Sequence, residues 1–419
     1  MLMTPKEQIS FEAAHLELSA KLERKQLEVN ALLELTRAIQ ENYAESKLFQ
    51  IYTFTFLGLD TAERFALFAL DGSAWKCKLK HATAKDYFKV TLPDKFTSLK
   101  TMTEISDESG GFKEFNLVIP VSHKSSILAY LFLGGLQLDT SETLNRLAFI
   151  NAFTNVLVVA LENKRLVRQQ IYQEAIKKEL EIARSVQQNL FPAWLPSSDR
   201  MRVEAYYLPH QSVGGDFYEF IQLSEDKYLI AIADISGKGI PASLLMANFH
   251  ASLNTLVRQS SDLVTIVNEL NFLTGKSGKG DYFITAFIAI YDQISQKITY
   301  INAGHNPPVM ITDVETSPQF LEKGCTILGM FDKLPALEFG EIDTGRRFML
   351  FAYTDGLSEL RNPAGDEMGH EPLVKILAQL FEIQEKSIQP HIVQLIESHR
   401  DNHPYHDDIT FISFKAFQD

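Results

Sequence analysis

The stretch that decides the fold of this 419-residue chain is YLIAIADISGKGIPA, residues 228–242. It begins as an apolar run typical of a buried strand and reaches Asp234 where that run ends. Glycines then turn the chain toward a helix expected from Ser243 to Leu256, with Pro241 near its first turn. A carboxylate at the end of a buried strand is costly to ionise unless water or a cation meets it. Asp234 therefore needs such a partner.

Three other acidic turns stand in the same setting. Asp216 follows two glycines, Asp355 closes the apolar run 348–353 and precedes Gly356, and Asp407 with Asp408 comes directly before the apolar run 409–412. Glycine beside an aspartate lets the backbone approach closely, and hard divalent cations prefer oxygen ligands. Four such strand ends predict a site for a hard cation.

Composition sets the outer limits of the interpretation. A chain of 419 residues favours two domains plus connecting helices. A formal net charge of −13 argues against a nucleic-acid partner, because phosphate neutralisation requires a basic surface. The two cysteines, Cys77 and Cys325, lack metal-type spacing and are expected to be free thiols, which excludes a disulfide framework. No signal-peptide pattern or apolar run of ~20 residues is evident, so we expect a cytoplasmic protein without a membrane span.

Residues 1–44 are expected to contribute an N-terminal helix, since 6–44 are nearly free of Gly and Pro. A seam with alternating steps of three and four runs along it: His15, Leu18, Leu22, Lys25, Val29, Leu32, Thr36 and Ile39. Such a seam suits a coiled coil whose polar interruptions set the register. An amphipathic helix lying on its own domain explains the pattern equally well.

Residues 45–145 mix helix and hairpin signals. A helix is expected at 48–57, one hairpin at 64–79 with its turn at Asp71-Gly72, and another at 115–135 with its turn at 122–125. With Leu-Gly-Gly-Leu at 133–136 before the next helix, this stretch resembles a GAF-type sensor domain. The resemblance implies an α/β domain that binds a small molecule or receives a protein signal. No Cys/His group marks a haem or a metal, and an apolar core without ligand is the alternative.

Residues 146–194 are expected to form a helical linker. The stretch 141–190 lacks Gly and Pro and carries an apolar face, and the helix should end before Pro192. A helix of this length between two globular units suits a lever or a dimer stalk. We therefore expect a homodimer held through 6–44 and 145–190.

Residues 195–419 alternate strands, turns and helices as one unit that carries seven family-type blocks. In chain order they are EIARSVQQNLFP at 181–192, VGGDFY at 213–218, ADISGKGIPA at 233–242, TAF at 285–287, NAGHNPP at 302–308, YTDGLSE at 353–359 and DDIT at 407–410. Together these blocks resemble the SpoIIE/RsbU-like branch of the PPM metal-dependent protein phosphatases. The fold class implied for the whole chain is α+β: a GAF-like sensor, a helical linker and a C-terminal αββα sandwich.

The resemblance also implies the cofactor and its ligands. Two or more Mn²⁺ or Mg²⁺ ions would lie between the sheet edges, with Asp234 bridging two of them and the Ile235 carbonyl adding a ligand. Asp216, Asp355 and Asp407 would hold the other side, and Asp408 would either support Asp407 or serve a weaker site. Asp234, Asp216 and Asp355 are the residues implied in catalysis. Oxygen ligands of this kind match what Mg²⁺ and Mn²⁺ prefer, and two ions can acidify a water for in-line attack.

Substrate contacts are less well defined by the sequence. Three candidates lie in the turns near the cleft: Gly237, His305 and Asn306. A histidine satisfied within its own turn is the alternative for His305, and His406 could protonate the leaving serine or simply face solvent. Eukaryotic relatives place a His after the bridging Asp-Gly and an Arg upstream to bind phosphate. Here Ser236 follows Ile235 and Arg202 is no clear counterpart, so the general acid stays open.

The function that these features predict is a metal-dependent phosphoserine/phosphothreonine protein phosphatase gated by the N-terminal sensor. The implied substrate is a phosphorylated regulatory protein of the anti-sigma-factor-antagonist type. Two alternatives stay open. The Gly-Gly-Asp-Phe turn at 214–217 is similar to that of diguanylate cyclases, although the acidic residue expected after Asp216 is missing. A degenerate module that only binds phosphoprotein is the second, although every expected carboxylate is present.

Overall fold

The computed structural model describes residues 5–417, except 60–61, 73, 106–109, 125, 137–140, 279–280 and 316. Parts of some expected segments, such as residues 1–4 of the N-terminal helix and Ser125 of the second hairpin turn, lie outside this set. The chain divides into two compact units, Met1–Glu174 and Ala175–Asp419. The boundaries expected at 44, 145 and 194 stay predictions.

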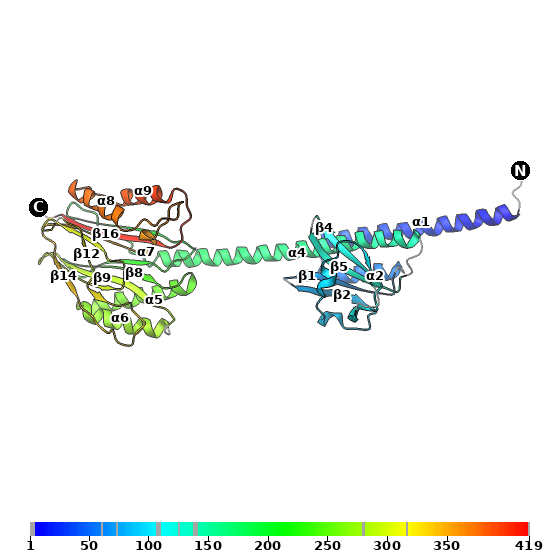
Figure 1. The fold of residues 1–419 in the computed structure, drawn as a ribbon, viewed down its shortest axis with the longest axis horizontal. Coiled ribbons are helices and arrows are strands. Elements are labelled where there is room, and N and C mark those ends of the chain that lie inside the picture. The colour runs from blue at the N-terminus through cyan, green and yellow to red at the C-terminus, as the bar shows by residue number, and fades with distance from the viewer. Residues whose placement is uncertain are drawn as a thin grey trace. The chain divides into compact units, whose positions relative to one another are not determined.

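The first unit is built around one antiparallel sheet (Figure 1). Its strands follow the order β2-β1-β5-β4-β3: β1 (Arg64–Asp71), β2 (Ala74–His81), β3 (Thr103–Glu104), β4 (Leu117–His123) and β5 (Ser126–Gly134). The helices are α1 (Pro5–Gln40), α2 (Glu45–Gly58), the short α3 (Asp94–Thr97) and the start of α4 (Ser141–Gln188), with 3-10 turns at Tyr87–Lys89 and Gly110–Phe112. Both hairpins expected from the sequence are present as β1–β2 and β4–β5.

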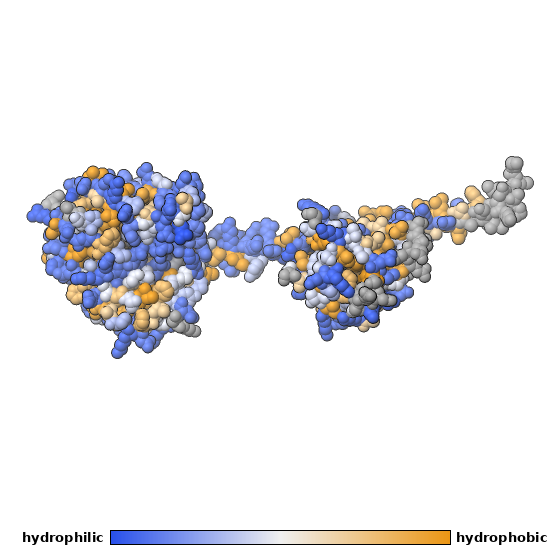
Figure 2. All heavy atoms as spheres, viewed as in Figure 1, coloured by the Kyte–Doolittle hydropathy of each residue, from blue (hydrophilic) through white to orange (hydrophobic). Residues whose placement is uncertain are grey.

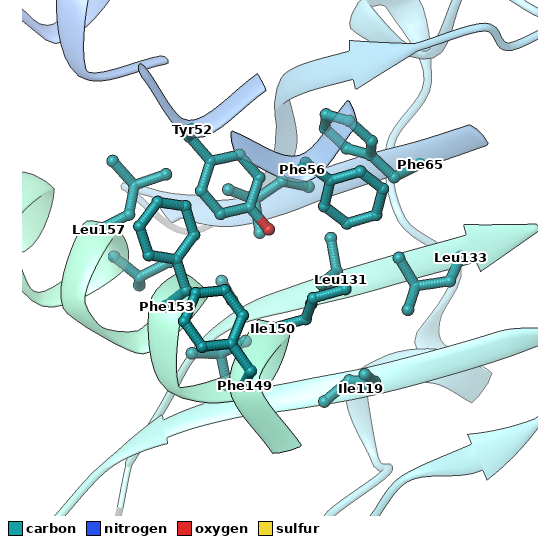
Figure 3. Packing of buried hydrophobic residues seen from close by; sticks show 14 of the residues in the cluster. Tyr52, Phe56, Phe65, Ile119, Leu131, Leu133, Phe149, Ile150, Phe153 and Leu157 are labelled. Carbon is teal, nitrogen blue, oxygen red and sulfur yellow. The ribbon is translucent and has the colours of Figure 1, made fainter. Parts of the chain in front are cut away.

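Large apolar side chains fill the space between the helices and one face of this sheet (Figure 3). Tyr52 of α2 stacks on Phe153 of α4 with ring centroids 5.3 Å apart, and its hydroxyl hydrogen-bonds Thr154 Oγ1 at 2.7 Å. Satisfying that hydroxyl lets a tyrosine lie fully buried. The opposite face carries a second cluster rich in phenylalanine, including Phe68, Phe112 and Phe132. Both faces of the sheet are therefore packed.

Helix α1 packs on its own unit along a face that differs from the expected seam. Ala31, Leu35 and Ala38 are buried, whereas Leu22 is 73% and Val29 is 50% exposed. Each of these buried positions comes one residue before a seam position, and the seam residues Leu32 and Ile39 are partly buried against the same core. Apolar side chains still lie at the surface along α1, as Figure 2 shows. The last turns of α1 therefore pack against the core, and a second apolar face of the same helix stays exposed.

Helix α4 is the one segment, among the described residues, that is long and apolar enough to cross a membrane by length and composition. In the most apolar 18-residue window of its Thr143–Gln188 part, 39% is buried inside the structure. Its first half supplies core residues such as Ile150, Phe153 and Leu157. The core helix of a soluble protein gives the same signal, so this is weak evidence for a span.

The second unit contains two sheets and the helices that cover them (Figure 1). One sheet has the order β13-β10-β9-β8-β7, with β14 also pairing β10, and the other has the order β12-β11-β15-β16-β6. The strands are β6 (Met201–Leu208), β7 (Phe217–Gln222), β8 (Lys227–Ile235), β9 (Ile284–Asp292), β10 (Lys297–Ala303), β11 (Val309–Thr312), β12 (Gln319–Phe320), β13 (Gly324–Cys325), β14 (Gly340–Asp343), β15 (Arg347–Tyr353) and β16 (Ile409–Phe417). The helices are α5 (Ile240–Gln259), α6 (Leu263–Gly278), α7 (Asp355–Ser358), α8 (Glu371–Glu382) and α9 (Gln389–Arg400).

Three apolar clusters show that this unit has four layers. On β8, Ile230 and Ile232 belong to the cluster between the two sheets, and the alternate residues Ala231 and Ala233 belong to the cluster under α5 and α6. Successive side chains of a strand point to opposite faces, so both faces of β8 are covered. A third cluster joins the other sheet to α8 and α9. The order helix, sheet, sheet, helix is the αββα sandwich that the resemblance implied.

The strand, turn and helix expected at 228–242 are present as β8 and α5, with Pro241 in the first turn of the helix. The pairing register then decides what lies at the end of β8. Phe217 pairs with Ala233, so Asp216 comes opposite Asp234. In the second sheet Tyr353 pairs with Phe411, so the residues after β15 and before β16 lie side by side. Segments distant in sequence are thereby brought to two adjacent strand ends.

Candidate metal centre and active site

Asp216 and Asp234 occupy neighbouring strand ends with side chains on the same face. Asp216 and Asp234 are each an even number of residues from a member of the inter-sheet cluster, Phe220 and Ile232 respectively. Because side chains alternate along a strand, both carboxylates point into the space between the sheets. Gly215 lies against this pair: a Cβ there would be 2.7 Å from the Ile235 carbonyl oxygen and 3.6 Å from Asp234 Oδ1. Only glycine permits that approach. The Ile235 carbonyl and the two carboxylates therefore share one small region.

Thr354 connects this region to the second sheet. Its Oγ1 donates to Asp216 Oδ2 at 2.8 Å and accepts the Thr410 N–H at 3.1 Å, and its own N–H donates to the Thr410 carbonyl at 3.0 Å. The next residue, Asp355, begins α7, whose Gly356 packs so tightly that a Cβ would lie 2.0 Å from the Asp408 carbonyl oxygen. The two sheets are thus joined at the carboxylates themselves.

Asp407 and Asp408 have different surroundings. Asp408 accepts a backbone N–H on each oxygen, from His210 at 2.7 Å and from Gly215 at 2.8 Å. Asp407 is exposed and receives Lys238 Nζ at 2.9 Å, while the same ammonium donates to the His406 carbonyl. Asp408 therefore holds the Gly-Gly-Asp turn through its hydrogen bonds, whereas Asp407 lies at the surface beside Lys238.

The electrostatics of the carboxylates show how close they are. Burial, followed by the charges of Asp234 and Asp408, raises the pKa of Asp216 well above its usual range. Burial and then the charges of Asp355, Asp407 and Asp408 raise the pKa of Asp234 to about 7. Burial and Asp407 likewise raise the pKa of Asp355. Carboxylates that hinder each other's ionisation in this way share one site, and positive charge among them relieves the cost.

Burial favours a structural role for His305. It is 5% exposed, its Nδ1 lies 3.0 Å from Thr285 Oγ1, and its N–H donates to Asn302 Oδ1 at 2.7 Å. Burial lowers the pKa of His305 to about 4, which makes it neutral at physiological pH. Asn306 donates to Ser358 Oγ at 3.1 Å and so ties this turn to α7. Nε2 of His305 is buried without a hydrogen-bond partner, and a contact of His305 or Asn306 with substrate stays a prediction.

The other sequence candidates lie at the surface or away from the site. Gly237 is exposed in the loop after β8, and His406 is exposed with its Nε2 3.2 Å from Nε2 of His403. Arg202 pairs with Lys415, which is seven residues past Asp408, so Arg202 lies ~23 Å along the strand from Asp408. Arg202 is therefore not a counterpart of a phosphate-binding arginine.

Sequence reasoning missed one residue that braces the site. Gln187 of α4 is 4% exposed, donates from Nε2 to the Gly214 carbonyl at 2.7 Å, and accepts the Gly214 N–H at 3.3 Å. Tyr207 donates to the same side-chain oxygen at 3.3 Å. The block at 181–192 contained Gln187, but nothing local in the sequence shows that its amide reaches a turn 27 residues away.

Comparison with known proteins gives a consistent result for the second unit. The family model "Stage II sporulation protein E (SpoIIE)" matches residues 224–417. Protein IcfG of Synechocystis sp. is 27% identical over 277 residues, which is 60% of this chain and 43% of that protein. Phosphoserine phosphatase RsbU of Bacillus subtilis is 30% identical over 194 residues, which is 46% of this chain and 57% of that protein. The matched part thus spans about half the length of these relatives.

Among solved structures, the SiaA-PP2C domain of Pseudomonas aeruginosa aligns with a TM-score of 0.51 and 22% identity. The alignment covers 58% of this chain and 98% of that domain, and it supports the fold. The C-terminal part of the chain therefore matches the SpoIIE family model and is homologous to RsbU.

The residues of the site fit a divalent ion by the chemistry of their donors. Five carboxylates and one backbone carbonyl supply hard oxygen atoms, and burial together with neighbouring carboxylates raises the pKa values of Asp216 and Asp234, a cost that a bound cation would relieve. Within the described residues, no three His, Cys, Asp or Glu side chains form a ready-made metal-binding group. The donors are near one another but their side chains do not converge on one point.

Proposed function

We propose that this chain is a metal-dependent phosphatase that removes phosphate from phosphoserine or phosphothreonine in a protein. The observation that carries the proposal is the meeting of Asp216, Asp234 and Asp355 at one end of the sandwich, where the charge of Asp234 helps to raise the pKa of Asp216 and the charge of Asp355 helps to raise the pKa of Asp234. RsbU, which resembles the C-terminal part, is named a phosphoserine phosphatase. The shared domain type and the carboxylate geometry both support hydrolysis.

Each residue of the site has a distinct part in the proposed mechanism. Asp216, Asp234, Asp355, Asp407 and the Ile235 carbonyl would hold two or more Mn²⁺ or Mg²⁺ ions. Bound ions of this kind supply a water of lowered pKa and neutralise phosphoryl oxygens. Thr354 orients Asp216 and keeps one of its oxygens hydrogen-bonded, and Asp408 fixes the turn before Asp216. Lys238 neutralises Asp407 across the loop that follows β8.

The substrate class and the regulation are part of the proposal. A phosphorylated regulator of the anti-sigma-factor-antagonist type fits the SpoIIE and RsbU resemblance. The first unit would act as a GAF-like sensor for a small molecule or protein signal, in a cytoplasmic protein. The uninterrupted α4 and the exposed apolar face of α1 would hold a homodimer through which the signal changes activity.

Phosphate release from a phosphoserine peptide by the full chain with Mn²⁺ tests the catalytic proposal. We expect Asp234→Asn to lower the rate at least about 100-fold, because a ligand to the ions becomes neutral. Asp199→Asn is the matched control, since this aspartate is 97% exposed and lies outside the site. An unchanged rate for Asp234→Asn contradicts the assignment.

Light scattering tests the proposed dimer separately. The exposed apolar positions of α1, such as Leu18 and Leu22, predict a mass of two chains at micromolar concentration. Replacing both by Glu should give one chain, because charges on a hydrophobic seam oppose association. A wild-type protein that stays monomeric would remove the dimer from the proposed regulation and leave the catalytic proposal intact.

A further inference from the structure

A cleft of about 600 Å³ lies between the end of α4 and the loop that precedes the Gly-Gly-Asp turn. It is lined by Leu180 and Arg184 of the helix, by the loop 209–213 and by Gly239. All of these residues belong to the second unit. Nothing in the proposed hydrolysis uses this space.

Two walls of the cleft connect to site residues, one through a hydrogen bond and the other through the next residue in the chain. His210, in the first wall, donates its backbone N–H to Asp408 Oδ1 at 2.7 Å. Gly239, in the second, follows Lys238, whose ammonium binds Asp407. The third wall is the end of α4, where Gln187 holds the Gly214 backbone one turn after Arg184. A molecule bound in the cleft therefore lies against the backbone that holds Asp408 and the Gly-Gly-Asp turn.

Arg184 is the one permanently charged residue that lines the cleft. Its side chain is exposed, and it forms no ion pair or hydrogen bond with any residue in the described part of the chain. Lys238, by contrast, is paired with Asp407. A guanidinium presents several N–H donors in a planar fork that suits a carboxylate or phosphate. The cleft thus offers a cation whose donors are available to a ligand.

The size of the cleft indicates how much of a ligand it can take. Pockets of ~300–1,000 Å³ hold whole small-molecule ligands, so a phosphoryl group alone leaves most of the space empty. Several side chains of a peptide would fill it better. The chain as a whole carries a net charge of −13 and repels acidic partners at a distance. A local cation is what an acidic segment requires in order to approach this site.

From this arrangement we infer that Arg184 binds an acidic side chain that flanks the phosphoserine of the substrate. The inference rests on the proposed function and adds a specificity-determining residue to it. The phosphoryl group occupies the carboxylate site with its ions, the flanking segment lies in the cleft, and Arg184 selects substrates with Asp or Glu in that segment. Arg184 lies on α4, whereas the seven-block resemblance gave candidate substrate contacts only in the turns after residue 200.

The test uses two phosphoserine peptides that differ only in having Glu or Gln beside the phosphoserine. With full-length protein and Mn²⁺, we expect Arg184→Ala to lower kcat/KM for the Glu peptide about three- to tenfold through KM. The Gln peptide and p-nitrophenyl phosphate should be unaffected. Arg184→Lys should recover part of the loss, and 1 M salt should remove the difference, because the Debye length is then about 3 Å. Lys178→Ala, which removes a charge from the same helix outside the cleft, is the control.

Two results would overturn the inference. One is an equal loss on both peptides and on p-nitrophenyl phosphate, which would place Arg184 in the chemistry or the fold. The other is no loss on either peptide. Fluorescence anisotropy with the labelled Glu peptide distinguishes a failure of the Arg184 inference from a failure of the proposed function. If no variant releases phosphate but wild type binds the peptide more tightly than Arg184→Ala does, the anion contact stands and hydrolysis fails.

Discussion

Thr354 donates a hydrogen bond to Asp216 across 138 residues of sequence, and this bond helps to join the two sheets at the site. The donor follows β15 and the acceptor precedes β7. The Thr354 hydroxyl also accepts from the Thr410 N–H, so it is satisfied on both sides. A buried carboxylate with raised pKa depends on such donors to keep its charge.

Replacing Thr354 by Val keeps the shape of the side chain and removes that bond. We expect unfolding free energy to fall by about 1.5–3 kcal/mol, because the hydrogen bond goes to a charged group. Phosphate release should fall about tenfold or more, because Asp216 loses its orientation. Denaturant titration and initial rates measure the two effects. Thr344→Val is the control: it removes a buried bond to the Gln296 carbonyl and should lower stability alone. Equal rates for both variants would show that Thr354 has no special role.

Replacing Gly215 by Ala tests the close approach of β7 and β8. The added Cβ would meet the Ile235 carbonyl at 2.7 Å, so the strand ends must separate. We expect a loss of about 1–3 kcal/mol in stability together with weaker Mn²⁺ binding in calorimetry. Gly275→Ala, inside α6, meets its nearest neighbour at an ordinary 3.4 Å and should be neutral or stabilising. A Gly215→Ala protein as stable as wild type would refute the tight contact.

Replacing Gln187 by Met tests the brace between α4 and the Gly-Gly-Asp turn. The change leaves the N–H and C=O of Gly214 without their side-chain partner, which costs about 1–3 kcal/mol when such groups are buried. Hydrogen exchange measured by mass spectrometry should therefore speed up at 213–216, by about 5- to 100-fold. The neighbouring Gln188→Met is exposed and should change nothing. Unaltered exchange in the Gln187 variant would mean that the turn is held by other contacts.

Burial of His305 predicts how stability depends on pH. Its folded pKa of about 4 lies below the unfolded value of 6.5, so the unfolded chain binds more protons between these values. Stability from this group is complete above pH 6.5 and is lost as the pH falls toward 4. The loss is about 2 kcal/mol by pH 5. His305→Gln cannot titrate and should show a smaller drop between pH 7 and 5 in urea unfolding. His391→Gln, 42% exposed, should retain the wild-type slope, and identical slopes for all three would disprove burial of a neutral His305.

The sequence was most informative where strand periodicity determined the outcome. The apolar runs before Asp234 and Asp355 and after Asp408 indicated strands, and alternation along a strand decides which way a residue beyond its end points. The aspartates could therefore be expected at one site before any pairing was known. Which of them binds an ion stays a prediction.

The supporting residues could not be predicted because their contacts are not local. Thr354 and Gln187 are ordinary polar residues in the sequence, and only pairing across 138 and 27 residues gives them their roles. On α1 the helical periodicity of apolar residues was visible in the sequence, but the face that became buried contains Ala31 and Leu35, whereas Val29 of the expected seam is exposed. The role of Lys238 is likewise not local, because the structure makes it the counter-ion of Asp407.

The bond from Gln187 to Gly214 has a practical consequence for anyone who shortens this protein. A fragment beginning near residue 195, where the sequence suggests cutting, loses that amide and also Arg184. Its rate of phosphate hydrolysis would then reflect two changes at once, namely the loss of control by the N-terminal unit and damage to the Gly-Gly-Asp turn. A fragment beginning at Ala175, where the compact unit begins, keeps both side chains and makes the comparison fair.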